Sequence, residues 1–377
     1  MTRLATINPS QTDTEAPKRV AIAMSGGVDS SAAAALLVEQ GHEVVGVHMK
    51  LHDLPEQEKH SKACCSLDDT LDARQACARL GIPFYVVDLS QEFEREVIQY
   101  FVESYRAGVT PNPCAKCNVA IKSKLLLEKV REFGCDYLAT GHYARVEQNS
   151  ETGVYQLMRP ADRHRDQTYF LFGTKAEELP ALMFPLADYL KPAARELAKS
   201  RDFLTWDKPD SQEVCFVPKD YREFLRKRFG EEAPQPGDFV DTNGRVLGRH
   251  QGLPYYTIGQ RRGLGLSAPE PLYVLSFDME HNAVVVGPEA GLDANEMIVT
   301  NANWVSCPPP IEPLEALVKV RYAHQGTRAT IEPLADNRLR VVFQEPVRAI
   351  TPGQAAAFYD GEVLLGGGWI ILDKSGG

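Results

Sequence analysis

The sequence predicts an α/β protein in which an N-terminal doubly wound parallel sheet is followed by a small central β-rich module and a C-terminal β-barrel. Three observations lead to this prediction. Short β-rich runs alternate with helical segments between residues 19 and 141, whereas helical patterns nearly vanish after Gln235. The length of 377 residues is also more than twice that of a typical domain of ~150 residues, so two or three domains are expected.

The first part of the chain contains the alternating signals. Strands are expected at residues 19–24, 43–49, 84–89 and 137–140, and helices from the Ser25 loop up to Gln40, at 67–80 and at 119–133. Each helix is followed by a glycine, the residue that most often ends a helix with a positive φ: Gly41, Gly81 and Gly134. In a parallel sheet of this kind the ligand binds beyond the carboxyl ends of the strands. The residues expected around that crevice are the Ser25 loop, His52, Asp88 and the pair Gly141-His142.

The rest of the chain changes character twice. Short helices and loops are expected from Glu147 to about Pro218, including a long proline-flanked segment at 179–199. After Gln235, alternating runs such as 339–343 and 362–365 are separated by turns at Asn243-Gly244 and Asp360-Gly361, and Pro308-Pro309-Pro310 is interpreted as a hinge between strands. The predicted divisions are a disordered tail at 1–18, an α/β domain at 19–220, a central module at 221–290 and a barrel at 291–377.

Composition and charge exclude several classes of protein. Apolar residues make up 44% and charged residues 24%, which is typical of a globular chain and excludes a disordered or fibrous one. The net charge of −10 excludes a uniformly basic nucleic-acid coat, although not a local basic face. The apolar run at 32–38 is far shorter than the ~20 residues that a membrane span needs. The first eighteen residues lack the features of a secretory signal or a transit peptide, so a cytoplasmic protein is expected.

The strongest chemical signal is the run Ser25-Gly26-Gly27-Val28-Asp29-Ser30-Ser31. It follows a predicted strand and opens a helix, which is the setting that a phosphate-binding loop needs. The two glycines let the backbone turn tightly and present N–H groups to an anion, and the helix N-terminus adds its positive dipole. Because the loop has no lysine of the Walker type, it is not expected to grip a transferring γ-phosphate.

Two cysteine motifs supply candidate nucleophiles. The first is Thr110-Pro111-Asn112-Pro113-Cys114-Ala115-Lys116-Cys117-Asn118, and the second is Asp210-Ser211-Gln212-Glu213-Val214-Cys215-Phe216-Val217-Pro218. Cys117 is expected near the N-terminus of the 119–133 helix, where the dipole favours the thiolate. From the residues alone a zinc knuckle, a redox pair and a purely structural role remain open, although no second close pair completes a zinc site.

The other cysteines have plainer interpretations. Eight cysteines are too few for a disulfide scaffold in a chain of this length. The pair Cys64-Cys65 is expected to pack against or cap the start of the 67–80 helix, and Cys77, Cys135 and Cys307 are expected to be core or surface thiols.

The Ser25 loop resembles the SGGxDS loop of the ATP pyrophosphatase, or adenine nucleotide α-hydrolase, superfamily. Together with both cysteine motifs it resembles the tRNA-specific 2-thiouridylases (the MnmA family), over nearly the whole chain. The other motifs that carry the resemblance are Cys64-Cys65-Ser66, Ala139-Thr140-Gly141-His142-Tyr143-Ala144-Arg145, Asp166-Gln167-Thr168-Tyr169-Phe170-Leu171, Thr257-Ile258-Gly259-Gln260-Arg261-Arg262-Gly263, Arg321-Tyr322 and Thr351-Pro352-Gly353-Gln354.

This resemblance implies an enzyme that uses ATP and Mg²⁺ to adenylate the carbon 2 oxygen of the wobble uridine in tRNA, releasing pyrophosphate. The residues implied around the ATP phosphates are Ala23, Met24, Ser25, Gly26, Gly27, Val28, Asp29 and Ser30, with Met49 and Gly141 at the nucleoside. Cys215 would carry a persulfide that a relay starting at a cysteine desulfurase delivers. Cys117 would help to release that sulfur onto carbon 2, giving 2-thiouridine and AMP, and would close a disulfide with Cys215.

The resemblance also implies which residues contact tRNA. Asn112, Pro113 and Cys114 would line the target base, which must leave its stack to reach the site. The family's tRNA-contact positions correspond here to His142, Arg165, Asp166, Gln167, Arg321, Tyr322 and Gln354. The expected partners are tRNA and a sulfur donor, and the chain is expected to be a monomer.

One residue departs from the family pattern. Many members have an aspartate at the position of Cys114, and a thiol is a poorer general acid or base than a carboxylate at neutral pH. The extra thiol leaves a second chemistry open, in which Cys114, Cys117 and Cys215 hold an iron–sulfur cluster with an open iron for sulfide.

A local excess of basic residues offers a way for an acidic protein to bind RNA. Between residues 221 and 262 there are eight basic residues and five acidic ones, a net charge of +3 in a chain that is −13 elsewhere. The run Arg226-Lys227-Arg228 is expected to contact tRNA phosphates.

Two other classes of protein remain possible from the sequence. Another ATP pyrophosphatase-type synthetase would share the Ser25 loop, and a redox or metal-sensing RNA-binding module would use the cysteines but leave that loop unexplained. The acidic residues Asp68, Asp69 and Asp72 are expected to form a solvated first helical turn. His48 and His52 can either contact nucleotide or serve a structural role.

Overall fold

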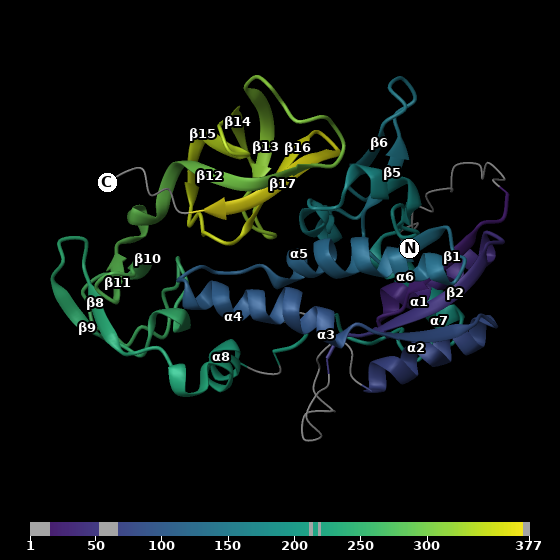
Figure 1. Ribbon diagram of the computed structural model, residues 1–377, viewed down its shortest axis with the longest axis horizontal. Coiled ribbons are helices and arrows are strands. Elements are labelled where there is room, and N and C mark those ends of the chain that lie inside the picture. The colour runs from purple at the N-terminus through teal and green to yellow at the C-terminus, as the bar shows by residue number, and fades with distance from the viewer. Residues whose placement is uncertain (1–15, 53–66, 211–213, 218–219, 372–377) are drawn as a thin grey trace, which may run out of the picture.

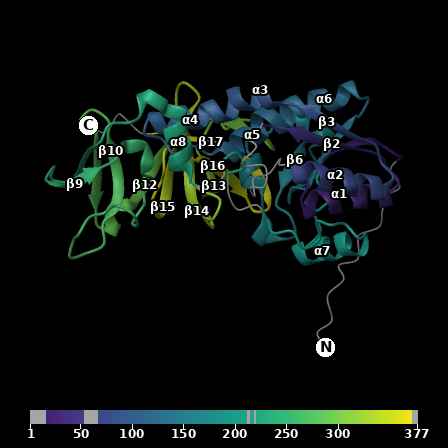
Figure 2. The same cartoon turned by 90° about the horizontal axis from the view of Figure 1, so that it is seen from below.

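The structure, a computed structural model, describes residues 16–52, 67–210, 214–217 and 220–371. Figure 1 shows three parts: the parallel sheet with its helices at the right, the barrel at the top and the central module at the lower left. Figure 2 shows the same order of parts along the long axis. The pair Cys64-Cys65 and residues Ser211 and Pro218 lie outside the described residues.

Five strands form a parallel sheet in the order β3-β2-β1-β4-β7. They are β1 Arg19–Ala23, β2 Glu43–Lys50, β3 Phe84–Asp88, β4 Tyr137–Thr140 and β7 Leu182–Met183. Along β1 the buried side chains alternate between two apolar clusters: Val20 and Ile22 belong to one, Ala21 and Ala23 to the other. The sheet is therefore covered on both faces, as the doubly wound prediction requires.

Helices cover the two faces in separate groups. One group consists of α1 Val28–Glu39, α2 Leu67–Leu80 and α7 Lys191–Ser200. The other consists of α3 Ser90–Phe93, η2 Glu94–Ile98, α4 Gln99–Arg106, α5 Pro113–Cys117, η3 Asn118–Leu126 and α6 Leu127–Glu132. The run Ala32–Ala35 in α1 is fully buried, and these small side chains let α1 lie close to both α2 and α7.

Most predicted boundaries in this part agree with the structure to within one or two residues, and Gly41, Gly81 and Gly134 do have positive φ. Two features differ from what the sequence analysis gave. The helical stretch at 90–106 was not predicted at all. The helix expected at 119–133 begins six residues earlier, because Pro113 is well suited to the first helical turn and the Asn112 side chain caps it by accepting from the Ala115 N–H at 3.1 Å.

The segment between β4 and the central module is mostly irregular, as expected. Its elements are β5 Arg145–Gln148, β6 Tyr155–Met158, η4 Arg163–Arg165, η5 Thr168–Leu171 and η6 Ala176–Ala181, followed by β7 and α7. The hairpin of β5 and β6 does not join the parallel sheet. It pairs with β17 of the barrel instead, so this segment fastens the two parts together.

The central module begins with a helix, α8 Tyr221–Phe229, followed by η7 Gly230–Glu232. Its four-stranded sheet has the order β10-β11-β8-β9. The remaining elements of the module are β8 Gly237–Val240, β9 Val246–His250, η8 Leu253–Tyr255, β10 Tyr273–Asp278, β11 Ala283–Gly287 and η9 Glu289–Leu292. The turn predicted at Asn243-Gly244 lies between β8 and β9, and Gly244 has a φ of +81°.

The C-terminal strands close into a barrel. They are β12 Asp293–Trp304, β13 Leu314–Lys319, β14 Thr327–Pro333, β15 Arg338–Arg348, β16 Ala355–Asp360 and β17 Val363–Ile371. Because β12 pairs with both β15 and β17, the sheet closes on itself. The run Pro308-Pro309-Pro310 separates β12 from β13, and Asp360-Gly361 turns between β16 and β17, both as predicted. The predicted fold class is confirmed.

Within the described residues, no helix is long and apolar enough to cross a membrane.

Candidate functional site

The Ser25 loop joins the end of β1 to the start of α1, and its conformation depends on glycine. Gly26 has a φ of +73°, and a Cβ atom there would lie 2.3 Å from the carbonyl oxygen of Asp69. The Ser30 hydroxyl donates to the Gly27 carbonyl at 3.1 Å and accepts from the Ser25 N–H at 3.2 Å. The loop is thus shaped before any anion arrives, with the N-terminus of α1 at its end.

The other residues predicted for ATP lie at or near the carboxyl ends of β1, β2 and β4. A Cβ atom on Gly141 would lie 2.7 Å from the Ser30 nitrogen, so the end of β4 packs directly on the loop. The Met24 side chain is fully buried and the Ala23 and Met49 side chains nearly so. Any contact of Ala23 and Met24 with a ligand is therefore through the backbone.

A buried lysine that the sequence analysis missed faces the loop. Lys191, from the first turn of α7, donates to both carboxylate oxygens of Asp29 at 2.7 Å and forms an ion pair with Asp210 at 2.8 Å. Its side chain is 8% exposed. The Tyr143 hydroxyl also donates to Asp29, at 3.1 Å. The loop lacks a lysine in its own sequence, yet the fold places an ammonium group beside it.

A second lysine, Lys208, binds to the loop and to two nearby carboxylates. Lys208 donates to the Gly26 carbonyl at 3.0 Å, to Asp69 at 2.6 Å and to Asp72 at 2.7 Å. The prediction of a solvated acidic turn was therefore wrong for Asp69 and Asp72, because this lysine, from a segment far along the chain, neutralises them. Asp69 is 7% exposed, whereas Asp68 stays on the surface.

Asp210, which opens the second cysteine motif, connects that motif to the phosphate loop. Besides Lys191, it forms ion pairs with Arg165 at 2.7 Å and Arg195 at 3.2 Å. Although burial alone would raise the pKa of the Asp210 carboxyl, the hydrogen bond from Lys191 and the three positive charges hold it below its ordinary value. A network of charges therefore reaches from Asp29 to a residue five positions before Cys215.

The first cysteine motif folds as the short helix α5, and this corrects the expected state of Cys117. The residue lies at the end of α5 rather than at a helix N-terminus, and it is 7% exposed. Burial raises the pKa of its thiol to about 11, which the Lys122 charge opposes and the neighbouring Cys114 reinforces. Cys117 is therefore a neutral thiol at pH 7. Cys114, in contrast, is exposed.

The second cysteine motif is anchored by its aromatic neighbour. The Phe216 ring lies 5.7 Å from that of Phe93 and 5.2 Å from that of Phe101, both edge to face. Cys215 is half-buried and packs against the same apolar cluster that contains Cys117. Of the remaining cysteines, Cys77 and Cys135 are core residues and Cys307 is half-buried, as expected.

The predicted tRNA-contact residues have different environments. Arg165 is 41% exposed, but Asp166 is buried and accepts from the Thr168 N–H, and the Gln167 side chain accepts from the Tyr143 N–H at 2.8 Å. Burial, with a smaller contribution from the Lys122 charge, holds the pKa of His142 well below its ordinary value. The His142 ring is therefore neutral at pH 7.

The barrel contributes an aromatic surface near the first cysteine motif. Tyr322, which is 40% exposed, lies 4.8 Å from the Phe170 ring, and the Lys319 ammonium lies 5.8 Å from the Tyr322 ring centre. The guanidinium of Arg321 donates to the Arg348 carbonyl. An exposed aromatic ring beside cationic groups is the kind of surface on which an unstacked base can lie.

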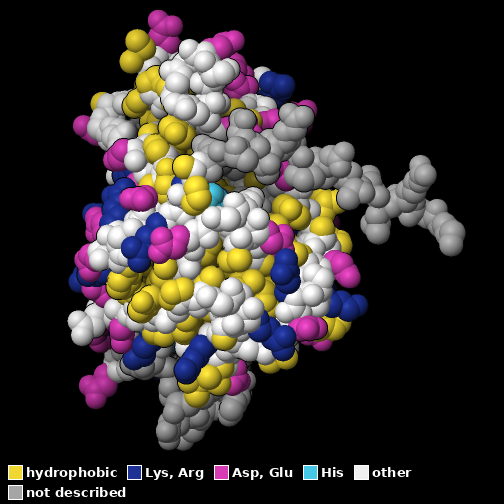
Figure 3. All heavy atoms as spheres, turned by 90° about the vertical axis from the view of Figure 1, so that its right-hand side faces the viewer, with side chains coloured by type: hydrophobic (Ala, Val, Ile, Leu, Met, Phe, Trp, Pro, Cys, Tyr) yellow, Lys and Arg dark blue, Asp and Glu magenta, His cyan; other side chains and the backbone are white. Residues whose placement is uncertain are grey.

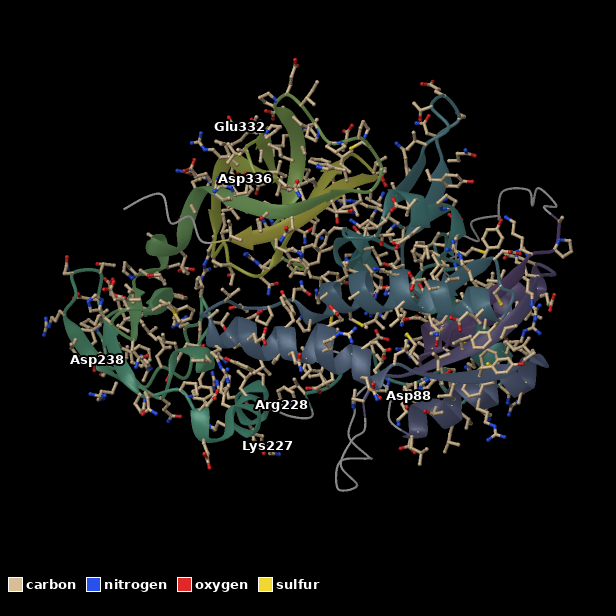
Figure 4. The ribbon with its side chains drawn as sticks, viewed as in Figure 1. Asp88, Lys227, Arg228, Asp238, Glu332 and Asp336 are labelled. Atoms are coloured by element: carbon tan, nitrogen blue, oxygen red, sulfur yellow. The ribbon has the colours of Figure 1, made fainter. Side chains whose placement is uncertain are left out.

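Three residues outside the nucleotide loop have structural partners. Both His48 ring nitrogens are engaged, with the Met24 carbonyl at 2.7 Å and with Thr70 at 3.0 Å, which favours the structural alternative for this histidine. Asp88, labelled at the end of β3 in Figure 4, accepts from Ser90 and pairs with Lys50. His52 lies 6.2 Å, ring to ring, from Phe93.

The basic run of the central module is tied to other groups. Arg228 forms a two-bonded ion pair with Glu94 of η2, at 2.6 and 3.0 Å, and the Arg226 guanidinium lies 4.9 Å from the Tyr255 ring centre. In Figure 4, Arg228 is the nearer of the two labelled α8 residues to α4, and Lys227 points away. On the face shown in Figure 3, basic side chains are interspersed with acidic ones.

Comparison with known proteins identifies the family. Residues 18–219 match the family described as tRNA methyl transferase HUP domain, 222–288 the tRNA methyl transferase PRC-barrel domain and 294–370 the aminomethyltransferase beta-barrel domain. The tRNA-specific 2-thiouridylase MnmA of Carboxydothermus hydrogenoformans is 50% identical over 94% of this chain and 97% of its own. The protein of the same name from Geobacter metallireducens is 49% identical over 94% and 97%.

Among solved structures, a 4-thiouridine synthetase in complex with RNA and ATP covers 56% of this chain and 50% of its own at 18% identity. Its TM-score of 0.33 is too low to carry any argument. The relatives matched over nearly their whole length, together with the match of residues 18–219, show the family. The chain belongs to the tRNA-specific 2-thiouridylase (MnmA) family.

Proposed function

We infer that this chain is an ATP-dependent tRNA-uridine 2-sulfurtransferase, which adenylates the carbon 2 oxygen of the wobble uridine and replaces that oxygen with sulfur. The observation that carries this function is the identity of about half of all residues with 2-thiouridylases over 94% of the chain. The nucleotide and cysteine regions described above supply groups for the two steps, activation and sulfur transfer.

The activation step is assigned to the Ser25 loop and the two lysines. The backbone of the loop and the N-terminus of α1 bind phosphate oxygens, and Lys191 and Lys208 hold the loop and the carboxylates beside it in place. Gly141 lets the end of β4 pack directly on the loop at Ser30. Making the uracil oxygen part of an AMP ester turns it into a good leaving group.

In this region Mg²⁺ would bind mainly through the phosphates of ATP rather than at a site formed by the protein alone. No group of three or more histidine, cysteine or acidic side chains within the described residues is placed to hold a metal ion, and the nearby carboxylates Asp29, Asp69, Asp72 and Asp210 bond lysines. Mg²⁺ commonly binds through phosphates and one or two carboxylates, of which Asp29 is the nearest candidate. When bound, it would neutralise charge on the pyrophosphate.

The sulfur step is assigned to Cys215 and Cys117. The terminal sulfur of a Cys215 persulfide attacks carbon 2, and AMP leaves with the uridine oxygen. The Cys117 thiolate then attacks Sγ of Cys215, which breaks the persulfide bond, leaves sulfur on carbon 2 and forms a Cys117–Cys215 disulfide. A thiol reductant and a sulfur donor must restore the starting state. Because Cys117 is protonated at rest, this step also requires a proton acceptor.

The substrate is proposed to lie between the first cysteine motif and the barrel. At the start of α5, Asn112 and Pro113 are buried and Cys114 is exposed, and Tyr322 offers a ring for stacking. His142, Arg165 and Arg321 stay predicted tRNA contacts, as do the less exposed Asp166 and Gln167, whereas the Gln354 amide is engaged by Thr110 and Pro111. A monomeric state and a cytoplasmic location also stay predictions.

Two of the three alternatives that the sequence left open are weakened by particular observations. An iron–sulfur cluster would need Cys114, Cys117 and Cys215 together, and no such group of three ligands is found within the described residues. Another synthetase of the superfamily would not share half its residues with 2-thiouridylases over almost the whole chain.

The test is nucleoside mass spectrometry of unmodified tRNA incubated with the protein, Mg-ATP and a polysulfide, which supplies sulfur at the persulfide level, alongside Cys117→Ser, Cys215→Ser and the control Cys307→Ser. The proposal predicts one sulfur gained at the wobble uridine in the wild type and the control, and in neither active-site variant. Absence of any sulfur-containing uridine with the wild-type protein would refute it.

A further inference from the structure

The barrel forms hydrogen bonds with the first residues of the first cysteine motif, just before α5. The side-chain amide of Gln354 donates to two successive carbonyl oxygens, those of Thr110 and Pro111, both at 3.1 Å. These residues directly precede Asn112, the residue that caps α5. A single side chain from the barrel thus satisfies two carbonyls of an irregular segment that has no partner strand of its own.

The backbone of the same barrel loop adds to this contact. The Thr110 N–H donates to the Pro352 carbonyl at 3.0 Å. Gly353 has a φ of +88°, and a Cβ atom there would lie 2.3 Å from Val109 Cγ1 and 2.7 Å from the Thr110 oxygen. Only glycine permits this close approach, so the loop and the segment 109–111 are fitted to each other.

Gln354 is itself held firmly. Its backbone N–H donates to the Thr351 carbonyl at 3.2 Å, and its carbonyl accepts from the Ile370 N–H of β17 at 2.9 Å. The amide that reaches Thr110 and Pro111 is therefore presented by the rigid barrel rather than by a mobile surface side chain.

A second connection reaches the motif from its other end. Asn118, which follows Cys117, donates to the Phe170 carbonyl at 3.1 Å, and the Phe170 ring lies against Tyr322 of the barrel. The neighbouring Tyr169 hydroxyl donates to the Ala355 carbonyl at 3.0 Å, one residue after Gln354. Both ends of the Asn112–Cys117 segment are thereby connected to the same edge of the barrel.

We propose that Gln354 is a positioning residue for the helix α5: its amide fixes the entry to that helix and keeps Cys117 in its buried place. This role differs from the tRNA contact that the resemblance implies, because both carbonyls already engage the side-chain nitrogen. The structural part of the proposal stands independently, and its consequence for sulfur transfer rests on the proposed function.

The first test reads the position of Cys117 without any substrate. Gln354→Glu keeps the shape of the side chain but replaces the donor with an acceptor that faces two carbonyls. We expect alkylation of Cys117, followed by peptide mass spectrometry, to become about tenfold faster, as the loss of two hydrogen bonds predicts. Alkylation of Cys135 in the sheet part and of Cys307 near the barrel should be unchanged, which separates a local effect from unfolding. An unchanged rate at Cys117 would overturn the proposal.

The matched control is Gln344→Glu, a barrel glutamine whose amide donates to Glu315 on the barrel surface. It should leave the alkylation of Cys117 as in the wild type. If Gln344→Glu accelerates it equally, the effect is one of barrel charge and the proposal fails.

The second test separates positioning from tRNA contact. Gln354→Ala should lower kcat for thiolation about tenfold and leave the Kd for tRNA within twofold, as expected for a residue that acts through another. A weaker Kd with unchanged kcat and unchanged alkylation would show a tRNA contact and refute the positioning role. If the wild type itself forms no 2-thiouridine, the proposed function fails while the alkylation test still decides the structural claim.

Discussion

The candidate site has two regions that differ in how far they are preorganised for reaction. We call the Ser25 loop with Lys191 and Lys208 the nucleotide end, and Cys117 and Cys215 the cysteine end. At the nucleotide end the backbone is fixed by Gly26, and Lys191 and Lys208 are bonded to carboxylates beside the loop. At the cysteine end Cys117 is buried and protonated, and its pKa is about 11. The comparison teaches that the fold fixes the charged groups beside the Ser25 loop in advance but holds Cys117, the thiol proposed for the sulfur step, in its protonated form at rest.

This difference has a chemical advantage. A permanently ionised Cys117 would be oxidised or would attack the Cys215 persulfide before any uridine was adenylated. A neutral, buried thiol avoids both side reactions. The charge network through Asp210 is the part of the structure that touches both ends, since it joins Lys191 to the segment that carries Cys215.

The largest expected effect concerns pH. Because the pKa of Cys117 is about 11, its thiolate fraction and its alkylation rate should rise tenfold per unit of pH, about 10³-fold from pH 7 to pH 10. Stopped alkylation with peptide mass spectrometry measures this directly. The unfolded chain is the control, in which the same thiol should level off near its ordinary pKa of 9. If the alkylation rate of Cys117 in the folded protein levelled off below pH 9, its pKa would not be raised, and the proposed difference between the two ends would be wrong.

The second prediction concerns a substitution that should affect the nucleotide end and leave the cysteine end unchanged. Lys191→Met leaves Asp29 and Asp210 without their shared ammonium group and should slow AMP formation about 10²-fold. Alkylation of Cys117 should not change. The matched control is Lys199→Met in the same helix, where the ammonium lies over the Trp206 ring on the surface, and it should retain full activity. Equal losses in both variants would argue against a role for Lys191 at the phosphates.

The third prediction concerns the basic run on α8. Reversing the charges of Arg226 and Arg228 should weaken tRNA binding about tenfold and flatten its salt dependence, while ATP binding is retained. The ion pair of Arg228 with Glu94 offers a second explanation for weaker binding, a displaced module. Glu94→Gln is the control: it removes the ion pair but keeps the arginines, and it should leave the salt slope unchanged. An unchanged slope in the double reversal would exclude phosphate contacts here.

The smallest expected effect concerns the influence of the Lys122 charge on the pKa of Cys117. Lys122 lowers the pKa of the Cys117 thiol, so Lys122→Met should raise that pKa further and slow alkylation several-fold at pH 9. The pKa of His142 should move upward in the same variant, because the Lys122 charge depresses it. Titration of the histidine by NMR measures this shift. Faster alkylation would show that Lys122 acts on Cys117 in some way other than through its charge.

The sequence was a good guide where the signal is local. The Ser25 loop, the strands around it and the glycines that end the helices could be predicted because turn chemistry and hydrophobic periodicity act over a few residues. The helical stretch at 90–106 could have been found in the same way, since Phe93, Val97 and Phe101 repeat every four residues and are all buried.

Other features could not be predicted because they join distant segments. Lys191 and Lys208 lie more than 150 residues from the loop that they face, and neither sits in a motif of phosphate-binding type. The buried state of Cys117 depends on the packing of α5 within a large apolar cluster, and this burial outweighs a helix dipole assumed from local sequence. The hydrogen bonds from Gln354 to the carbonyls of Thr110 and Pro111 form only once the barrel is folded.

The central claim is that the two ends carry out successive steps and that only the second needs Cys117. The most direct measurement is a single-turnover reaction of Cys117→Ser with unmodified tRNA, Mg-ATP and a sulfur donor, analysed for both adenylated and thiolated uridine. The account predicts release of pyrophosphate at the wild-type rate and no 2-thiouridine. Formation of 2-thiouridine by this variant, or loss of pyrophosphate release, would contradict it.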